Sequence, residues 1–101
     1  MRVIVMFDLP METSSNAREY RRFRKFLIKS GFIMMQQSVY SKLTLNATAS
    51  NMVAENIRKN KPNDGLVQLL IVTENQYNRM EFIVGKKNYD VLENNERLIV
   101  L

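Results

Sequence analysis

The residue whose type and position best suit chemistry is Asp8, a carboxylate at the end of the apolar run Val3 to Phe7. A carboxylate that ends a buried strand must be solvated, paired or bound to a metal ion to offset its loss of hydration. The 101-residue chain has no His and no Cys, so the commonest general base and the thiolate ligands of zinc are absent. An active site in this chain would therefore use carboxylates and a hard cation, Mg²⁺ or Mn²⁺.

Asp8 also has an ordinary structural interpretation, as a strand-end residue that caps the following loop or pairs with an arginine. One carboxylate makes a poor magnesium site, because the ion usually takes one or two carboxylates with water and phosphate oxygens. A two-fold axis near the strand ends would bring Asp8 of two chains to one ion, which would polarise a phosphodiester and lower the pKa of a bound water. The sequence permits hydrolysis of nucleic acid without requiring it.

Positive charge is concentrated in residues 18–29, which hold six basic residues and one acid, whereas the remainder of the chain has nine of each sign. The whole net charge of +5 therefore lies in this segment. At about 100° per helical residue, all of its basic residues except Arg24 fall within an arc of about 100°. Such a face is typical of a protein that binds nucleic acid backbone. The candidate contacts are Arg18, Arg21, Arg22, Lys25 and Lys29.

A charged helix face often does no more than face water. One alternative is therefore a ferredoxin-like dimer that senses a small molecule and whose charged helix face is only solvated. Surface helices usually mix signs, however, whereas Arg18 and Arg22 lie four residues apart and repel. A polyanion would relieve this repulsion, with strong salt dependence and little sequence preference. Arg24 points toward the edge of the apolar side, where it either follows the surface or reaches a carboxylate such as Asp8 or a partner chain.

The segments that must position these residues alternate between strand and helix patterns. In chain order they are a strand at 2–9, a helix at 16–30, two strands or one bent strand within 32–45, a helix at 46–60 and a strand at 66–73. Asn16 with Glu19 is the expected capping pair of the first helix, and Asn46 caps the second. The strand break is expected near Gln36 and Gln37. The aromatic residues expected in the core, rather than on bases, are Tyr20, Phe23, Phe26 and Phe32.

This order predicts an α+β fold, a ferredoxin-like βαββαβ sheet with both helices on one face and extra C-terminal strands. Apolar residues on both faces of the first strand predict a homodimer packed sheet to sheet. We expect one domain at residues 1–85 and a C-terminal extension at 86–101. A turn or short helix is expected at 74–79, with further strands at Glu81 to Val84 and Arg97 to Leu101 that are available to a partner.

No apolar run approaches the ~20 residues that cross a bilayer, and Met1 leads directly into a strand rather than into a signal peptide. We therefore expect a cytoplasmic protein with no membrane partner. The absence of Cys excludes disulfides and redox chemistry.

Three stretches carry a family resemblance when taken together: Phe7 to Pro10, Arg21 to Leu27 and Gly31 to Lys42. They resemble the small CRISPR-associated adaptation protein, in particular the subgroup from systems with a single large RNA-guided effector. The likeness covers essentially the whole chain. It implies a ferredoxin-like homodimer that holds double-stranded DNA and sets the spacing between active sites of the CRISPR integrase during spacer capture.

The resemblance also implies a metal-dependent endonuclease on RNA or DNA, whose metal residue corresponds to Asp8. Many members have Tyr before that aspartate, where this chain has Phe7. The closing segment resembles the part of the family that pairs with the integrase. Its candidate contacts are Arg97, Leu98, Ile99 and Val100. A free-standing endoribonuclease of the toxin type, with the same fold and no partner, is the alternative.

Overall fold

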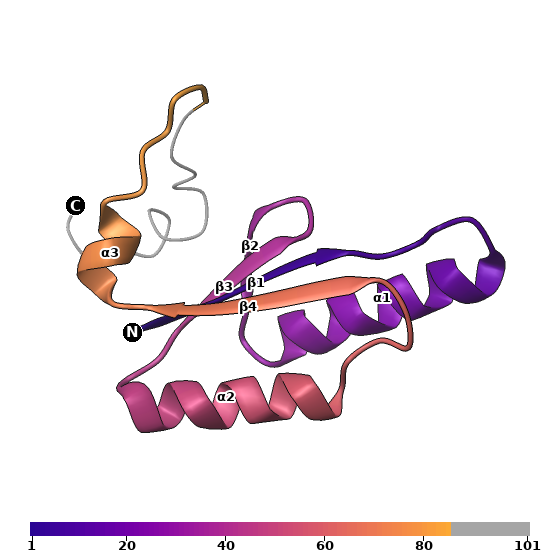
Figure 1. The fold of residues 1–101 in the computed structure, drawn as a ribbon, viewed down its shortest axis with the longest axis horizontal. Coiled ribbons are helices and arrows are strands. Elements are labelled where there is room, and N and C mark those ends of the chain that lie inside the picture. Colours follow the sequence, from indigo (N-terminus) through magenta and orange to yellow (C-terminus); the bar gives the residue numbers. More distant parts are fainter. Residues whose placement is uncertain (86–101) are drawn as a thin grey trace, which may run out of the picture.

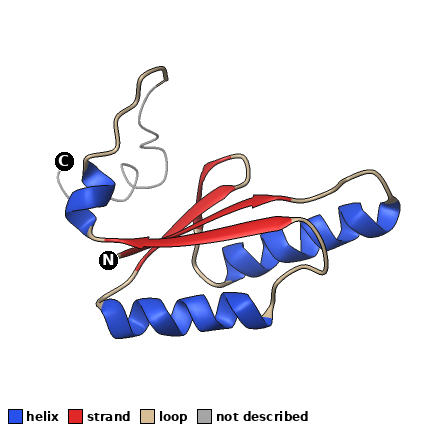
Figure 2. Cartoon of the chain, in the orientation of Figure 1, coloured by secondary structure: helices blue, strands red, loops and turns tan. Residues whose placement is uncertain are grey.

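The computed structural model describes residues 1–85. Its elements in chain order are β1 (Arg2–Asp8), α1 (Ser14–Lys29), β2 (Ile33–Gln36), β3 (Val39–Leu43), α2 (Ala47–Lys59), β4 (Leu66–Val72) and α3 (Glu74–Asn78). The strands form one antiparallel sheet in the order β2-β3-β1-β4. Figures 1 and 2 show α1 and α2 together on one side of this sheet and α3 at its other side. The predicted βαββαβ order and α+β ferredoxin-like fold are confirmed.

The core lies between the sheet and the two long helices. Val5 of the central strand β1 is paired with Tyr40 of β3 and with Leu69 of β4. The helix-facing side of β1 packs on Phe23 and Leu27, both fully buried. The four aromatic residues expected in the core are found there, either buried or packed against it. No helix within residues 1–85 is long and apolar enough to span a bilayer.

The N-terminus of α1 differs from the prediction. Thr13, in extended backbone conformation, is the N-cap, and its Oγ1 accepts a hydrogen bond from the Asn16 backbone N–H at 3.0 Å. Asn16 therefore lies inside the first turn, and Glu19 pairs with Arg22 instead of reaching back to the cap. The predicted Asn16–Glu19 capping pair is wrong, because the helix begins three residues earlier and Thr13 caps the N–H groups of its first turn.

The second half of the sheet agrees with the sequence pattern. The break expected near Gln36 and Gln37 is the tight turn between β2 and β3, where Ser38 adopts a positive φ of 66°. Asn46 caps α2 as predicted, since its Oδ1 accepts from the Ala49 N–H at 2.8 Å. β4 ends at Val72, and the turn or short helix expected after it is α3.

Beyond α3 the chain leaves the sheet, as the upper orange segment of Figure 1 shows. Residues 79–85 contain no strand, so the strand predicted for Glu81 to Val84 is wrong for the single chain. No strand within residues 1–85 pairs with this segment, and Ile83 and Val84 remain 78% and 90% exposed. The predicted extension 86–101, its strand and the contacts Arg97, Leu98, Ile99 and Val100 lie outside the described residues.

Candidate nucleic-acid interface and carboxylate site

Asp8 lies at the end of β1 on the open face, the face of the sheet opposite α1 and α2. Strand alternation places it with Ile4 and Met6, and its partner across the ladder is Leu66 of β4. The side chain is exposed, and it forms no ion pair within residues 1–85. The arginine-paired interpretation of Asp8 is therefore not found in the described chain.

The backbone on both sides of Asp8 is fixed by two turns. The Phe7 N–H donates to the Ser38 carbonyl at 3.0 Å, which ties β1 to the β2–β3 turn. On the other side Gly65 has a φ of 93°, and a Cβ there would stand 2.8 Å from the Asp8 carbonyl oxygen. Only glycine allows this approach without strain. The Asp8 carboxylate thus sits on a rigid strand end rather than on a loop.

Residues 1–85 of one protomer do not build a complete metal site. Within residues 1–85 no three acidic side chains gather closely enough to hold an ion. Asp8 supplies a single carboxylate, whereas Mg²⁺ takes six oxygen ligands and usually one or two carboxylates among them. The donor set fits a hard cation only if a second chain or phosphate oxygens complete it.

Four exposed cations of α1 form what we call the basic ridge: Arg18, Arg21, Lys25 and Lys29. The ridge lies on the side of α1 opposite Phe23 and Leu27, which are buried against the sheet. None of its members forms an ion pair in the part of the chain that the structure describes. The ridge is therefore a row of positive charge facing solvent, as the sequence predicted.

Arg22 is engaged differently from the other predicted contacts. Its guanidinium binds Glu19, with Nη2 to Oε1 at 2.8 Å, and also donates to the carbonyls of Asn60 and Lys61 at 3.2 and 3.3 Å. The hydrogen bond between the two side chains lowers the pKa of the Glu19 carboxyl and raises the pKa of Arg22. Arg22 thus ties α1 to the loop after α2, a role that the sequence pattern did not reveal.

Arg24 does not pair with Asp8. Its side chain is exposed, but it also binds a buried residue of the sheet. Its Nε donates to the Tyr40 hydroxyl at 3.0 Å, and Tyr40 is only 1% exposed. Tyr40 comes from β3, so this contact joins the helix to the sheet. No local sequence signal marks such a contact, because the two residues lie sixteen positions apart.

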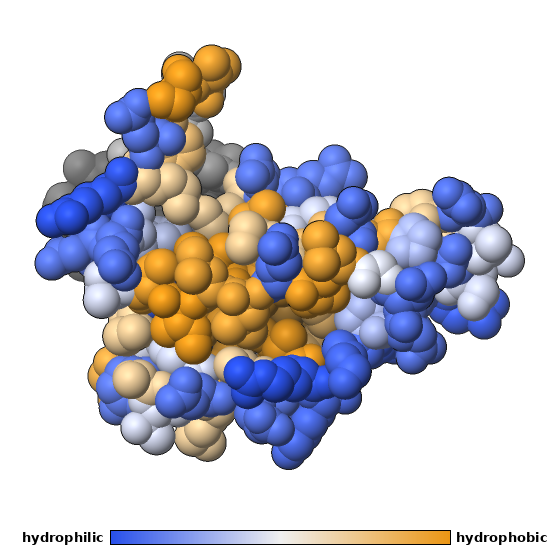
Figure 3. All heavy atoms as spheres, viewed as in Figure 1, coloured by the Kyte–Doolittle hydropathy of each residue, from blue (hydrophilic) through white to orange (hydrophobic). Residues whose placement is uncertain are grey.

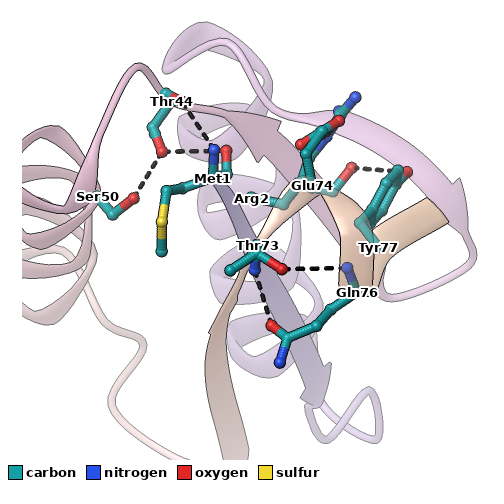
Figure 4. A network of polar contacts seen from close by, with 9 residues as sticks. Met1, Arg2, Thr44, Ser50, Thr73, Glu74, Gln76 and Tyr77 are labelled. Carbon is teal, nitrogen blue, oxygen red and sulfur yellow. Dashed lines mark hydrogen bonds and ion pairs between the residues drawn. The ribbon is translucent and has the colours of Figure 1, made fainter. Parts of the chain in front are cut away.

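A polar cluster covers one end of the open face (Figure 4). Arg2 of β1 binds Glu74 at 2.9 Å, and its guanidinium lies 4.3 Å from the centre of the Tyr77 ring. The Tyr77 hydroxyl in turn lies 3.5 Å from Ser41 Oγ of β3. This cluster, which the sequence reading missed, fixes α3 over the beginning of β1 and leaves the Asp8 end of the face uncovered by α3.

The remainder of the open face is largely apolar along β4, where only Gln68 interrupts it between Leu66 and Leu70. Leu66 and Leu70 of β4 are 54% and 51% exposed, and both share this face with Asp8. Hydrophobic atoms gather in the middle of Figure 3, over the position of β4, and again at the tip of the segment after α3. Patches of this kind on a small domain mark interaction surfaces.

A family model described as CRISPR associated protein Cas2 matches residues 1–80. The chain belongs to the Cas2 family. A protein named CRISPR-associated endoribonuclease Cas2 from Treponema denticola is 56% identical over 101 residues, which is the whole of both chains. A Cas2 of the same name from Ligilactobacillus salivarius is 48% identical, again over the whole of both chains. The resemblance that the sequence motifs indicated is thereby confirmed.

A solved Cas2 also shares the fold. The crystal structure of Streptococcus pyogenes Cas2 at pH 6.5 superposes with a TM-score of 0.60 and 17% identity. The match covers 84% of this chain and 100% of that one. It supports the ferredoxin-like architecture from structure, independently of sequence similarity.

Proposed function

We propose that this Cas2-family chain is the adaptor subunit of a CRISPR spacer-acquisition complex. In that role a homodimer binds the backbone of double-stranded DNA without sequence preference and bridges dimers of the CRISPR integrase. The observation that carries the proposal is the basic ridge, whose four cations have no acidic partner within residues 1–85. From Arg18 to Lys29 the ridge is about 16 Å long. A duplex of that length carries about ten phosphate charges, so the ridge suits a DNA backbone.

The open face supports the homodimer. Leu66 and Leu70 present half of their surface to solvent, and a second copy packed sheet to sheet would remove it from water. The segment with Phe82, Ile83 and Val84 is equally apolar and has no strand partner in the described chain. It would form its strand only on pairing with another chain.

A metal-dependent endonuclease activity is the second part of the proposal and is separable from the first. It is supported by the exposed Asp8, which forms no ion pair within residues 1–85, and by the relatives' name of endoribonuclease. Two Asp8 carboxylates of a homodimer would hold one Mg²⁺ or Mn²⁺ with water and phosphate oxygens. The bound ion would polarise the phosphodiester and lower the pKa of a bound water. RNA is then a substrate as well as DNA.

The deciding experiment is integration of spacer-like duplex DNA by the cognate integrase. Reactions contain no adaptor, the wild type, Asp8→Asn, or the ridge variant Arg21→Gln with Lys25→Gln. We expect the wild type and Asp8→Asn to stimulate integration equally and the ridge variant to fail. No stimulation by the wild type would overturn the adaptor role, and failure of Asp8→Asn alone would make the carboxylate essential to it.

A free-standing endoribonuclease of the toxin type remains the second candidate, because the relatives are named endoribonucleases. Its signature would be RNA cleavage by the isolated protein with Mg²⁺, lost with a chelator and in Asp8→Asn. Cleavage of this kind, together with no effect on integration, would replace the adaptor role by this one.

A further inference from the structure

A second group of positive charges lies at the C-terminal end of α2. Arg58, Lys59 and Lys61 occur within four residues, and together with Glu55, Pro62 and Asn63 they line an open hollow of about 620 Å³. Pro62 is buried and anchors the loop, whereas the side chains of Lys59 and Lys61 are exposed. The sequence did not single out this group, because the charges of all residues outside 18–29 sum to zero.

The fold places this group beside the basic ridge. Arg22 of α1 donates to the carbonyls of Asn60 and Lys61, so the end of α2 adjoins the first half of α1. Hydrophilic atoms run without a break in Figure 3 from the first half of α1 to the end of α2. The two groups of cations therefore lie on neighbouring parts of the surface, and the hollow between α1 and the loop after α2 is lined by Glu19 and Asp64 as well.

The charges exceed what the end of a helix requires. Basic residues at a helix C-terminus compensate its dipole and its free carbonyls. Here Arg22 already binds the carbonyls of Asn60 and Lys61, and the Asn60 side chain binds the Asn56 carbonyl at 2.8 Å. Arg58 is neutralised by Glu55 at 3.0 Å. Lys59 and Lys61 have no ion-pair partner in residues 1–85.

We propose that Lys59 and Lys61 bind phosphates of the same duplex that the basic ridge holds, which makes the interface two helices wide. This inference rests on the proposed function and extends it. Because α1 and α2 lie side by side, cations on both can contact phosphates that a single row of side chains does not reach. Glu55 holds Arg58 to one side of the hollow, so the two lysines carry the contact.

The test is equilibrium binding of a random-sequence duplex, followed by fluorescence anisotropy over a series of salt concentrations. The protein is the wild type, Lys59→Gln with Lys61→Gln, the charge-preserving pair Lys59→Arg with Lys61→Arg, or Arg79→Gln as the control. Arg79 is an exposed cation that caps the C-terminus of α3, on the other side of the sheet. Each of the two lysines is also changed to Gln singly, which matches the control in charge. Thermal unfolding and sedimentation confirm that all variants are folded and in the same oligomeric state.

We expect the double Gln variant to bind about tenfold more weakly at about 0.1 M salt and its salt slope to fall by about 1.8, from two lost phosphate contacts. The Arg pair should bind as the wild type does. If each single Lys variant weakens binding no more than Arg79→Gln, these lysines only compensate the helix dipole and the inference is overturned, with the ridge unaffected. If the wild type binds no duplex, the proposed function itself fails and this extension fails with it.

Discussion

Arg24 and Tyr40 make a polar contact at the margin of an apolar core. The Tyr40 ring is buried, lies nearly parallel to Phe7 at 5.7 Å, and places its hydroxyl 3.0 Å from Arg24 Nε. A charged donor at this position satisfies a hydroxyl that would otherwise lose water on burial. The same contact engages Arg24, which helical geometry places away from the basic ridge, with a residue of the sheet.

We expect Tyr40→Phe to lower the free energy of unfolding by about 1–2 kcal/mol, because a hydrogen bond to a charged group is lost while the ring is retained. The measurement is urea unfolding followed by circular dichroism. Tyr20→Phe is the matched control, since the Tyr20 hydroxyl lies 3.5 Å from Ser38 Oγ, at the limit of a hydrogen bond. Equal losses in the two variants would show that the Arg24 contact contributes nothing.

At the scale of elements, the start of α1 depends on Thr13. Thr13→Ala should lower the free energy of unfolding by about 1 kcal/mol, the usual cost of removing an N-cap oxygen. Asn16→Ala should change it by less than about 0.5 kcal/mol, or raise it slightly, because Asn16 occupies a helical position where alanine is favoured. Urea midpoints at constant slope give both values. A larger loss in Asn16→Ala than in Thr13→Ala would contradict the assigned cap.

The elements themselves were largely predictable, because each carries a local signal. Alternation and apolar runs indicated the strands, helical spacing indicated α1 and α2, and Asn46 marked the start of α2 correctly. The cap of α1 was misplaced because Thr13 and Asn16 are both good capping residues, and local chemistry does not choose between them. The strand at Glu81 to Val84 was predicted from its apolar residues, but a strand also needs a neighbour to accept its hydrogen bonds.

The candidate site was predictable only in part, because some of its contacts join residues that lie far apart in the sequence. Asp8 and the basic ridge follow from one strand and one helix, and both lie where the sequence placed them. The contacts of Arg22 with Asn60 and Lys61 join residues 38 and 39 positions apart, so they depend on how α1 and α2 pack. Periodicity contains no such information. The second basic group and the cluster around Arg2 were missed for the same reason.

At the scale of the whole molecule, the proposed homodimer depends on the open face. Leu70→Asp should shift the protein from dimer to monomer at micromolar concentration, because a charge would be buried without a partner in the sheet-to-sheet interface. Sedimentation velocity is the measurement. Leu45→Asp is the control, since Leu45 is 90% exposed and lies outside the sheet, directly before the cap of α2. A dimer that persists in Leu70→Asp would exclude this face as the interface.

The outer edge of β4 has a consequence for the tendency of the protein to aggregate. β4 is an edge strand of the described sheet, and its sequence, Leu66 to Val72, consists of six aliphatic residues and one Gln, with no charge and no Pro. Natural edge strands usually carry a lysine, a proline or a bulge that prevents other chains from adding to them. Within residues 1–85 this edge has no such guard, so a protomer without its proposed partner would present a template for amyloid-like growth. We therefore expect assembly into the proposed homodimer to protect this edge from aggregation.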